Sequence, residues 1–560
     1  MNILTSGRQV ISLMAVCFFL SSSPLLAATP DRPDAGRTLG GLQDRKPPVT
    51  DRSPVIEIDG QPQPPSAVAD GAKVALRGLR ITGQNLYGED KLIALVADAV
   101  DRELTFGDLE ALAARIARHF RDHGYLLANA YIPAQEIVDG VVEIRVVVGQ
   151  YGKIVVNNRS HLADSRINGV LGSLKSGGYI ERQPLERALL LLSDTSGVSA
   201  RASLAPGAVH GTSDLTVEIN DAKPLSGEFF VNNHVNRFTG RTKAGLILNI
   251  NNPSGLGDTA TIGGIYTGSG LNNYTLDYRR PIGDQGAKWG VGFSRLHYSL
   301  GEEFAALDAT GLAKTVGVYV TYPLIRSREH NLTGRLGYDR KHLQDRIDST
   351  PADSRKKAGV WSLAFSGDSR DPLGGGGFTS FALGFTSGRL TMDSADAEIN
   401  DLLPQSAGNY SKTNISIHRE QYITDRLNFH LYFTGQLANK NLDSAEKLSA
   451  GGANGVRAYP EGEAAGDQGY IFNGELCWNL PTTSFQMAFF YDNAKIIPNK
   501  NPWDASTNKR VLAGAGFGLI WNRAGDYAIR LDYAWKITAD PATADTDKNG
   551  RLWLVGAKYF

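Results

Sequence analysis

The sequence has few of the residues that a disulfide scaffold or a helical membrane protein needs. Cysteine occurs twice in 560 residues and methionine four times. Lys and Arg together number 58, as do Asp and Glu, so no excess of either sign indicates nucleic acid or an acidic surface as a partner. After residue 30 no stretch approaches eighteen consecutive apolar residues, which excludes a transmembrane helix there. What is abundant is glycine, at 62 residues, which together with many aromatic residues favours strands and tight turns.

The first 28 residues have the pattern of a secretory signal peptide. A positively charged flank precedes an apolar core at residues 10–20, which is too short to span a membrane, and Ala27 or Ala28 offers a small residue for cleavage. Cys17 could suggest a lipoprotein, but the bulky valine before it does not suit lipoprotein processing. Removal of this leader would leave Cys477 alone. The sequence therefore predicts an exported protein without an intramolecular disulfide.

Residues 29–73 form a region of different composition, rich in Pro, Asp and Arg, with the pairs Pro47-Pro48 and Pro64-Pro65. Such a composition cannot bury a core, and it predicts an extended linker. Residues 38–44, TLGGLQD, are the candidate for one short helix. The pair Gly40-Gly41 disfavours a long helix there.

Two small α/β domains are predicted after the linker, at residues 74–150 and 151–221. In the first, apolar residues recur at helical spacing within 92–99 and 109–120, and an alternating strand follows the turn Asp139-Gly140. The order is strand, helix, helix, strand, strand. The second domain repeats this order with little sequence identity.

Residues 222–560 have the pattern of strands with two unlike faces. Segments of about ten residues place apolar side chains at every second position, as in Ile529, Leu531, Tyr533 and Trp535 against Arg530, Asp532 and Lys536. A strand with its turn and loop takes roughly 21 residues, which predicts about sixteen strands over this length. A soluble β-sandwich or propeller is the alternative, but it does not explain charged residues on one face and aromatic residues on the other.

The fold class is therefore predicted to be mainly β, with a transmembrane antiparallel β-barrel of about sixteen strands preceded by two small α/β domains. In lipid only a closed sheet satisfies every backbone group. Motifs for catalysis are missing, among them His-Glu-x-x-His, Cys-x-x-Cys, Gly-x-Ser-x-Gly and the P-loop. We expect no enzyme activity, no cofactor and no metal. Residues 545–550 imitate the start of an EF-hand loop, but position twelve is Gly556 instead of Glu, so a polar surface hairpin is favoured.

The segment Gly451 to Tyr470, GGANGVRAYPEGEAAGDQGY, resembles the conserved loop of the two-partner-secretion transporters, the hemolysin secretion/activation family of the FhaC and ShlB type. That family usually has Val-Arg-Gly followed by an aromatic residue. Here Val456, Arg457 and Tyr459 match the motif, and Ala458 stands in place of the glycine. The resemblance extends over nearly the whole mature chain, and it implies that the two α/β domains are POTRA domains.

The resemblance also implies a partner for Arg457. In the family this arginine pairs with the Asp of a Phe-x-Asp motif on a barrel strand, which Phe490-Tyr491-Asp492 matches. The strand pattern agrees, because Phe490 and Asp492 share one face while Tyr491 lies on the other. If Tyr491 faces lipid, Asp492 faces the lumen. We therefore expect a lock between loop and lumen that consists of Val456, Arg457, Tyr459, Phe490 and Asp492.

From the same resemblance follows a function: export of one large, hemolysin- or adhesin-like exoprotein across the outer membrane of a Gram-negative bacterium, with the POTRA domains in the periplasm. The expected partners are that exoprotein, outer-membrane lipid and, during biogenesis, the barrel-assembly machinery and periplasmic chaperones. No nucleic acid is expected. The alternative is a barrel insertase or assembly factor of the same superfamily. A diffusion porin is disfavoured because it would not need the two α/β domains.

Overall fold

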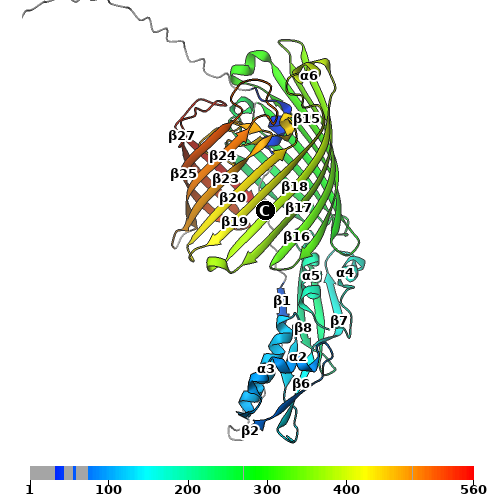
Figure 1. Ribbon diagram of the computed structural model, residues 1–560. Coiled ribbons are helices and arrows are strands. Elements are labelled where there is room, and N and C mark those ends of the chain that lie inside the picture. The colour runs from blue at the N-terminus through cyan, green and yellow to red at the C-terminus, as the bar shows by residue number, and fades with distance from the viewer. Residues whose placement is uncertain (1–31, 43–54, 59–72, 269, 482–483) are drawn as a thin grey trace, which may run out of the picture.

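The computed structural model describes residues 32–42, 55–58, 73–268, 270–481 and 484–560. The expected signal peptide lies outside these residues. A tall barrel stands above two small α/β units that follow one another below it (Figure 1). The barrel end that faces the α/β units is called the near end here, and the opposite end the far end. Within the described ranges, no helix is both long and apolar enough to cross a membrane.

Sixteen antiparallel strands form the closed barrel, which confirms the predicted fold class and strand number. The first strand, β10, pairs with the last, β27, where residues 228–232 lie opposite 555–559. Every other neighbour follows in chain order. The strands are β10 (Leu225–Asn232), β11 (Lys243–Asn251), β12 (Thr259–Tyr266), β13 (Leu271–Ile282), β14 (Ala287–Ser299), β15 (Ala309–Arg326), β16 (His330–Ile347), β17 (Ala352–Asp371), β18 (Gly377–Met392), β19 (Gly408–Tyr422), β20 (Leu427–Ala438), β23 (Gln468–Asn479), β24 (Phe485–Ile497), β25 (Arg510–Arg523), β26 (Tyr527–Lys536) and β27 (Gly550–Tyr559).

The outer face of the barrel is apolar because every second side chain of each strand points away from the lumen. On β26 the exposed outward residues are Ile529, Leu531, Tyr533 and Trp535, whereas the inward Asp532 is buried. Strands β15 to β18 are longer than the others and extend beyond them at the far end (Figure 1). Short elements lie in the connections, namely η2 (Arg237–Thr239), η3 (Glu302–Leu307), η4 (Leu373–Gly375), α6 (Ala395–Asn400), η5 (Ser444–Glu446), β21 (Leu448–Ser449) and β22 (Ala465–Gly466).

The first α/β unit packs two helices on a three-stranded sheet of order β3-β6-β5. The long helix α3 begins with a capping box, in which Thr105 and Asp108 each accept the backbone N–H of the other. A further strand, β4, was not predicted; it pairs with β2 in a separate two-stranded sheet. The elements are β2 (Lys73–Leu76), β3 (Gly78–Thr82), α2 (Glu89–Ala94), η1 (Ala97–Ala99), β4 (Arg102–Thr105), α3 (Phe106–Asp122), β5 (Ala128–Tyr131) and β6 (Val141–Val148).

The second α/β unit has the order strand, helix, helix, strand, strand. Its elements are β7 (Gln150–Arg159), α4 (Asp164–Leu171), α5 (Arg182–Ser193), β8 (Val198–Pro206) and β9 (Thr212–Asp221). Its sheet gains a fourth strand from the linker, since β1 (Val55–Ile58) pairs in parallel with residues 201–204 of β8. The predicted linker therefore supplies the edge strand of a sheet, which its proline-rich composition did not indicate.

The second unit is fixed to the near end of the barrel by charged contacts. Asp194, directly after α5, accepts two hydrogen bonds from the Arg326 guanidinium, at 2.7 and 2.8 Å. Arg166 on α4 pairs with Asp284 in the turn between β13 and β14 at 3.1 Å. A bidentate arginine–carboxylate pair fixes orientation as well as distance. The near-end turns of the barrel therefore determine how this α/β unit is held.

A short helix, α1 (Ala35–Gly41), packs inside the barrel against β14, β15, β16 and η5. It begins before the predicted segment 38–44, because Asp34 caps it by accepting the N–H of Arg37 at 2.8 Å. The Ala35 N–H donates to Asp345 of β16 at 2.8 Å, and the Ser444 hydroxyl donates to Asp34 at 2.7 Å. The helix ends at the glycine pair, in line with the short length that the pair indicated.

Candidate functional site in the barrel lumen

The loop between β20 and β23, residues 439–467, folds back into the barrel lumen. Strands β21 and β22 pair with each other near its two ends. Its tip consists of residues 456–459, in which the Val456, Ala458 and Tyr459 side chains are fully buried and Arg457 is 5% exposed. A loop tip with this little exposure is a docked element, unlike an ordinary surface loop.

Arg457 binds Asp492 of β24 through both its side chain and its backbone. The guanidinium Nε and Nη2 donate to the two carboxylate oxygens at 2.9 and 2.7 Å, and the Arg457 backbone N–H donates to Asp492 at 3.0 Å. Asp492 is completely buried, whereas Tyr491 beside it is 45% exposed on the outer face. The side-chain alternation of β24 thus places the aspartate in the lumen, where the loop reaches it.

A second group of charges surrounds this pair. Arg457 Nη1 donates to Glu475 of β23 at 2.8 Å and lies 3.6 Å from Asp532 of β26. Arg530 donates to Glu475 at 2.6 Å and to Asp532 at 2.8 Å. Three carboxylates are therefore shared between two guanidinium groups. Each arginine needs this compensation because a buried charge without a partner is strongly destabilising.

Aromatic side chains enclose the arginine from two sides. The Arg457 guanidinium carbon lies 3.3 Å from the centre of the Phe490 ring, a cation–π contact. The Trp553 indole N–H of β27 donates to the Arg457 carbonyl at 2.6 Å. Phe490 precedes Asp492 by two residues and therefore faces the lumen as well. The Phe-x-Asp pattern thus gives the arginine both a stacking surface and a counter-charge.

Ala458 and Tyr459 fit the barrel wall next to the arginine. A side-chain carbon added at Gly514 of β25 would lie 2.4 Å from the Ala458 methyl group, so only glycine at position 514 leaves room for this alanine. The Tyr459 hydroxyl shares a hydrogen bond of 2.7 Å with Thr538 and donates to the Asp540 carbonyl at 3.0 Å. The departure from the family's glycine at 458 is therefore accommodated by Gly514, which lies directly opposite Asp492 on the neighbouring strand.

Glu446 holds the start of the same loop from the other side of the lumen. It lies 2.6 Å from the Lys341 ammonium of β16 and 2.9 Å from the Lys412 ammonium of β19. Burial alone would raise the pKa of this carboxyl, but the two ammonium groups outweigh burial and lower the pKa to about 2. Glu446 therefore remains ionised and paired across the whole physiological pH range.

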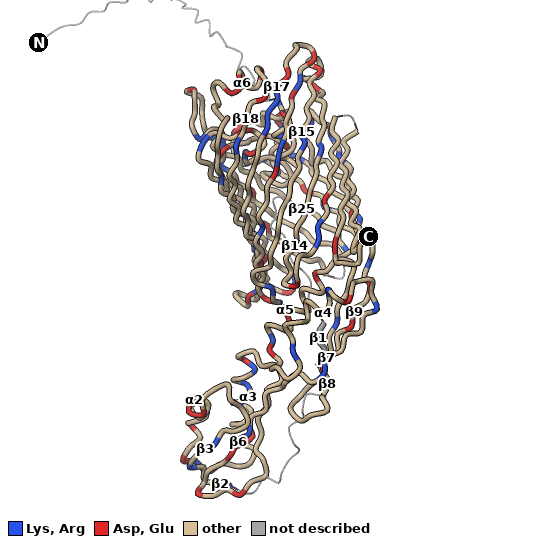
Figure 2. Tube along the Cα trace, turned by 90° about the vertical axis from the view of Figure 1, so that its right-hand side faces the viewer, with Lys and Arg blue, Asp and Glu red and all other residues tan. Residues whose placement is uncertain are grey.

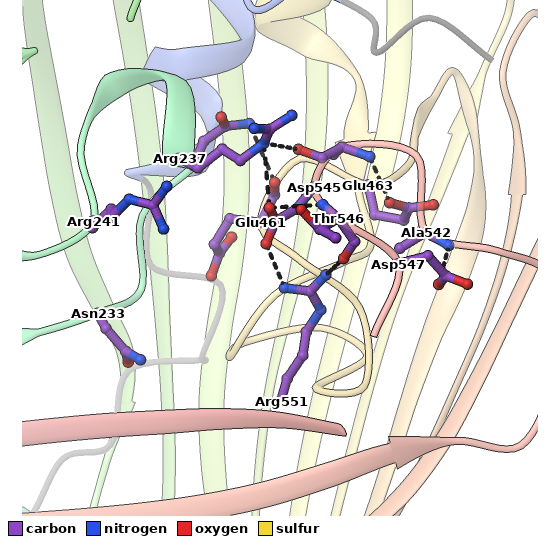
Figure 3. A network of polar contacts seen from close by, with 12 residues as sticks. Asn233, Arg237, Arg241, Glu461, Glu463, Ala542, Asp545, Thr546, Asp547 and Arg551 are labelled. Carbon is purple, nitrogen blue, oxygen red and sulfur yellow. Dashed lines mark hydrogen bonds and ion pairs between the residues drawn. The ribbon is translucent and has the colours of Figure 1, made fainter. Parts of the chain in front are cut away.

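Glu463 joins the end of the loop to the connection between β26 and β27. It accepts the backbone N–H groups of Thr543 and Ala544, each at 3.0 Å or less, and an Arg510 hydrogen bond at 2.6 Å. Figure 3 shows Glu463 beside Asp545 and Asp547 in this network. Asp545 binds Arg551 at 2.8 Å and lies 3.3 Å from Arg237. The EF-hand-like segment is thus a polar connection whose acidic groups pair with basic side chains, Asp545 with arginine and Asp547 with Lys536.

The structure brings Arg457, Asp492 and Phe490 into direct contact, buries Val456 beside them and places the Tyr459 hydroxyl against Thr538 and Asp540 in the connection that follows β26. Sequence reasoning did not assign Glu475, Arg530, Asp532 or Trp553 to the site. A signal existed for the first three, since each is a charged residue in the lumenal phase of its strand. Because the groups satisfy one another, the arrangement is suited to holding the loop in one position.

Two family models match this chain. Residues 211–520 match the model "Haemolysin secretion/activation protein ShlB/FhaC/HecB", and residues 74–149 match the ShlB-type POTRA domain. The first match contains the docked loop, Asp492 and most barrel strands, and the second corresponds to the first α/β unit.

Relatives and a solved structure agree with this assignment. The chain is 28% identical over 98% of both chains to the heme/hemopexin transporter protein HuxB of Haemophilus influenzae strain 86-028NP. It is 22% identical to the outer membrane transporter CdiB of Escherichia coli O6:K15:H31, covering 84% of this chain and 81% of that one. The structure of CdiB from Escherichia coli superposes with a TM-score of 0.68 at 19% identity, covering 91% of this chain and 94% of that one.

The barrel therefore lies in the outer membrane, with the POTRA region in the periplasm at its near end and the far end directed outward. With more than half of its residues matched by the family model, this outer-membrane transporter belongs to the haemolysin secretion/activation protein ShlB/FhaC/HecB family.

Proposed function

We propose that this transporter binds one large exoprotein in unfolded form through its periplasmic domains and secretes it through the barrel lumen. The client would be a hemolysin- or adhesin-like protein. The step is transport of a polypeptide without a catalytic reaction. Folding of the client outside the cell would bias the direction of movement.

Pairing of the linker strand with the second α/β unit is the observation that carries the capture step. Residues 55–58 add to β8 as an edge strand through backbone pairing. An edge that accepts one extended segment has the geometry to accept another, and backbone hydrogen bonds demand little of the client's sequence. We infer that the client binds along β8 and that β1 competes with it for the same edge.

Passage through the lumen is supported by the character of the inner wall and by what lies within it. Inward positions carry hydrogen-bonding groups such as Ser416, Thr434 and Asn473, which suit an extended backbone. Helix α1 and the docked loop both lie in this lumen. We infer that α1 must leave for the client to enter, and that the Arg457–Asp492 pair sets the shape of the passage.

The test is a comparison of secreted and outer-membrane proteins between the parent bacterium and a strain without this chain. The proposal expects one large protein to disappear from the culture medium while other outer-membrane proteins remain. Loss of many outer-membrane proteins instead would assign the chain to the alternative, a barrel insertase or assembly factor.

Variants then test the loop. Arg457→Ala and Asp492→Ala should each lower the amount of exported client at least tenfold at equal transporter level, because each removes the bidentate pair that holds the buried loop tip to β24. Lys495→Ala, on the same strand as Asp492 but in the outward phase, should export normally. Intact export by both loop variants would refute the role of the pair.

A further inference from the structure

Strands β14 to β18 carry a group of basic side chains on the outer face of the barrel, toward the far end. Figure 2 shows Lys and Arg positions recurring on the upper parts of β15 and β17, away from the α/β units. All of them occupy the outward phase of their strands, and all but the half-buried Lys357 are exposed. The residues of this basic belt are Arg295, Lys314, Arg340, His342, Lys357 and Arg389.

Strand register places these residues side by side. Arg295 lies opposite Lys314, and Lys314 lies opposite His342 on the next strand. His342 in turn lies opposite Lys357, so that four consecutive strands present one continuous basic row. Side chains directly opposite each other on one face of a sheet have their Cβ atoms roughly 5 Å apart, close enough for like charges to repel.

A second row lies one step closer to the middle of the barrel. Arg340 and Arg389 both lie opposite Gly359, which has no side chain to separate them. This row ends at Asn409 on β19, and the first row ends at Tyr274 on β13. The belt is therefore confined to one sector of the barrel, the sector where the strands are longest.

Most of this charge has no counter-charge within the described part of the protein. No described residue forms an ion pair with Arg295, Lys314, Arg340 or Arg389, although Lys357 pairs with Asp393 at 2.6 Å. Like charges opposite each other destabilise a sheet. A row of them on one face indicates that an anion from outside the protein balances the charge.

The belt begins where the apolar band of the barrel ends. On β15 the exposed outward residues run from Leu324 to Val316, and Lys314 is the next outward residue. The band from 316 to 324 spans about 26 Å along the strand, or about 20 Å in height at the usual tilt, which is close to the apolar band of outer-membrane barrels. Lys314 thus lies at the depth of lipid headgroups on the outer side.

We propose that the basic belt binds the phosphate groups of lipid headgroups in the outer leaflet and so anchors the β14–β18 wall in the membrane. The long side chains of Arg and Lys reach headgroups while their methylene stems lie along apolar surface. Arginine pairs with phosphate in a bidentate manner, and a row spaced by strand distances can hold several phosphates at once.

The experiment takes the full chain from nanodiscs of neutral phosphatidylcholine, with or without added lipid A, releases it into detergent micelles, and measures the lipid A that stays bound to the protein by native mass spectrometry. The parent protein should retain lipid A. A variant with Arg295→Gln, Lys314→Gln, Arg340→Gln and Arg389→Gln should bind it at least tenfold more weakly, because each basic residue near an anionic surface contributes roughly fivefold in affinity. Lys495→Gln, a single outward cation on β24, is the matched control and should bind as the parent does.

Two results would overturn the proposal. One is equal retention of lipid A by the parent and by the variant with four substitutions. The heat-shifted gel band that is characteristic of barrels shows that this variant is folded. The other is equal retention of dephosphorylated and phosphorylated lipid A by the parent. If the variant with four substitutions keeps lipid A but fails to export the client, the belt binds the emerging polypeptide and not the lipid.

Discussion

At the scale of single residues, Arg457 determines the position of the docked loop. Its guanidinium donates to two carboxylates and stacks on an aromatic ring, and its backbone N–H and carbonyl are both bound by barrel side chains. A buried, bidentate arginine cannot be replaced by another cation without loss, because lysine has neither the fork nor the planar stacking surface.

Arg457→Lys should therefore keep the charge and lose most of the lock. We expect trypsin to cleave the folded protein after residue 457 at least ten times faster than in the parent, because the loop undocks more often. The control is Lys495→Arg, which replaces a lysine by an arginine on the outer face of β24. It should leave the cleavage rate unchanged. A cleavage rate equal to the parent's for the lysine variant would show that the charge alone holds the loop.

Gly514→Ala tests the fit between the loop tip and the wall. The added methyl group would lie 2.4 Å from the Ala458 methyl group, so we expect undocking of the loop and a loss of about 1–3 kcal/mol of stability. The double variant with Ala458→Gly should recover most of this loss in an equilibrium unfolding cycle. Gly556→Ala, where nothing lies within 4 Å, is the control. Failure of the second change to restore stability would contradict the proposed fit.

Arg457 and Asp492 could be predicted because the loop motif named one and strand alternation placed the other in the lumen. Glu475 and Asp532 could not be assigned to the same site from sequence. Periodicity predicts which residues of a strand face the lumen. It does not predict which residues of β23, β24 and β26 lie at the same level of the barrel, since that depends on the stagger of the closed sheet. The fit of Ala458 to Gly514 is a contact between the docked loop and the barrel wall that no local pattern records.

At the scale of elements, the two described elements of the linker, α1 and β1, both pack on partners outside the linker. Helix α1 is seven residues long, shorter than an isolated helix that would be stable in water. Its N-cap and first turn are held by Asp345 and Ser444 from the barrel. Strand β1 is likewise completed by β8. The sequence indicated a short helix near this site, at 38–44, and no strand. Local sequence could not give the true bounds of the helix or the strand, because both depend on tertiary contacts.

Gly36→Ala should loosen α1. A side-chain carbon there would lie 2.4 Å from the Ser444 hydroxyl and 2.5 Å from the Ala445 backbone nitrogen. We expect a higher conductance in planar lipid bilayers, because the helix leaves the lumen more often. At Gly40 nothing lies within 4 Å, so Gly40→Ala should dock normally and gain helix propensity. Equal conductance of both variants would contradict the docked position of α1.

Ile56→Pro should free the edge of β8. Proline lacks a backbone N–H and has a fixed φ, so it is disfavoured inside a strand and should weaken the pairing of β1 with β8. If β1 and the client compete for this edge, an extended client peptide should bind the variant several-fold more tightly than the parent. Gln63→Pro is the control, because residue 63 follows the end of β1 and already stands between Pro62 and Pro64. Equal affinities of the parent and Ile56→Pro would argue against competition.

At the scale of the whole molecule, the barrel could be predicted well because its constraint is global. Lipid requires every strand to alternate and the sheet to close, so the same pattern recurs along residues 222–560. The position of the POTRA region could not be predicted. It depends on pairs such as Asp194 with Arg326, which lie 132 residues apart in the chain and belong to different domains.

The most direct test of secretion through the lumen is disulfide cross-linking of a client stalled by a stably folded C-terminal domain. In a Cys477→Ser background, Ser416→Cys places a thiol on the lumenal face of β19, and Ile415→Cys places one on the outer face of the same strand. The client, with single cysteines along its length, should cross-link to residue 416 and not to residue 415. Cross-linking to residue 415 alone, with export intact, would show that the polypeptide does not pass through the barrel.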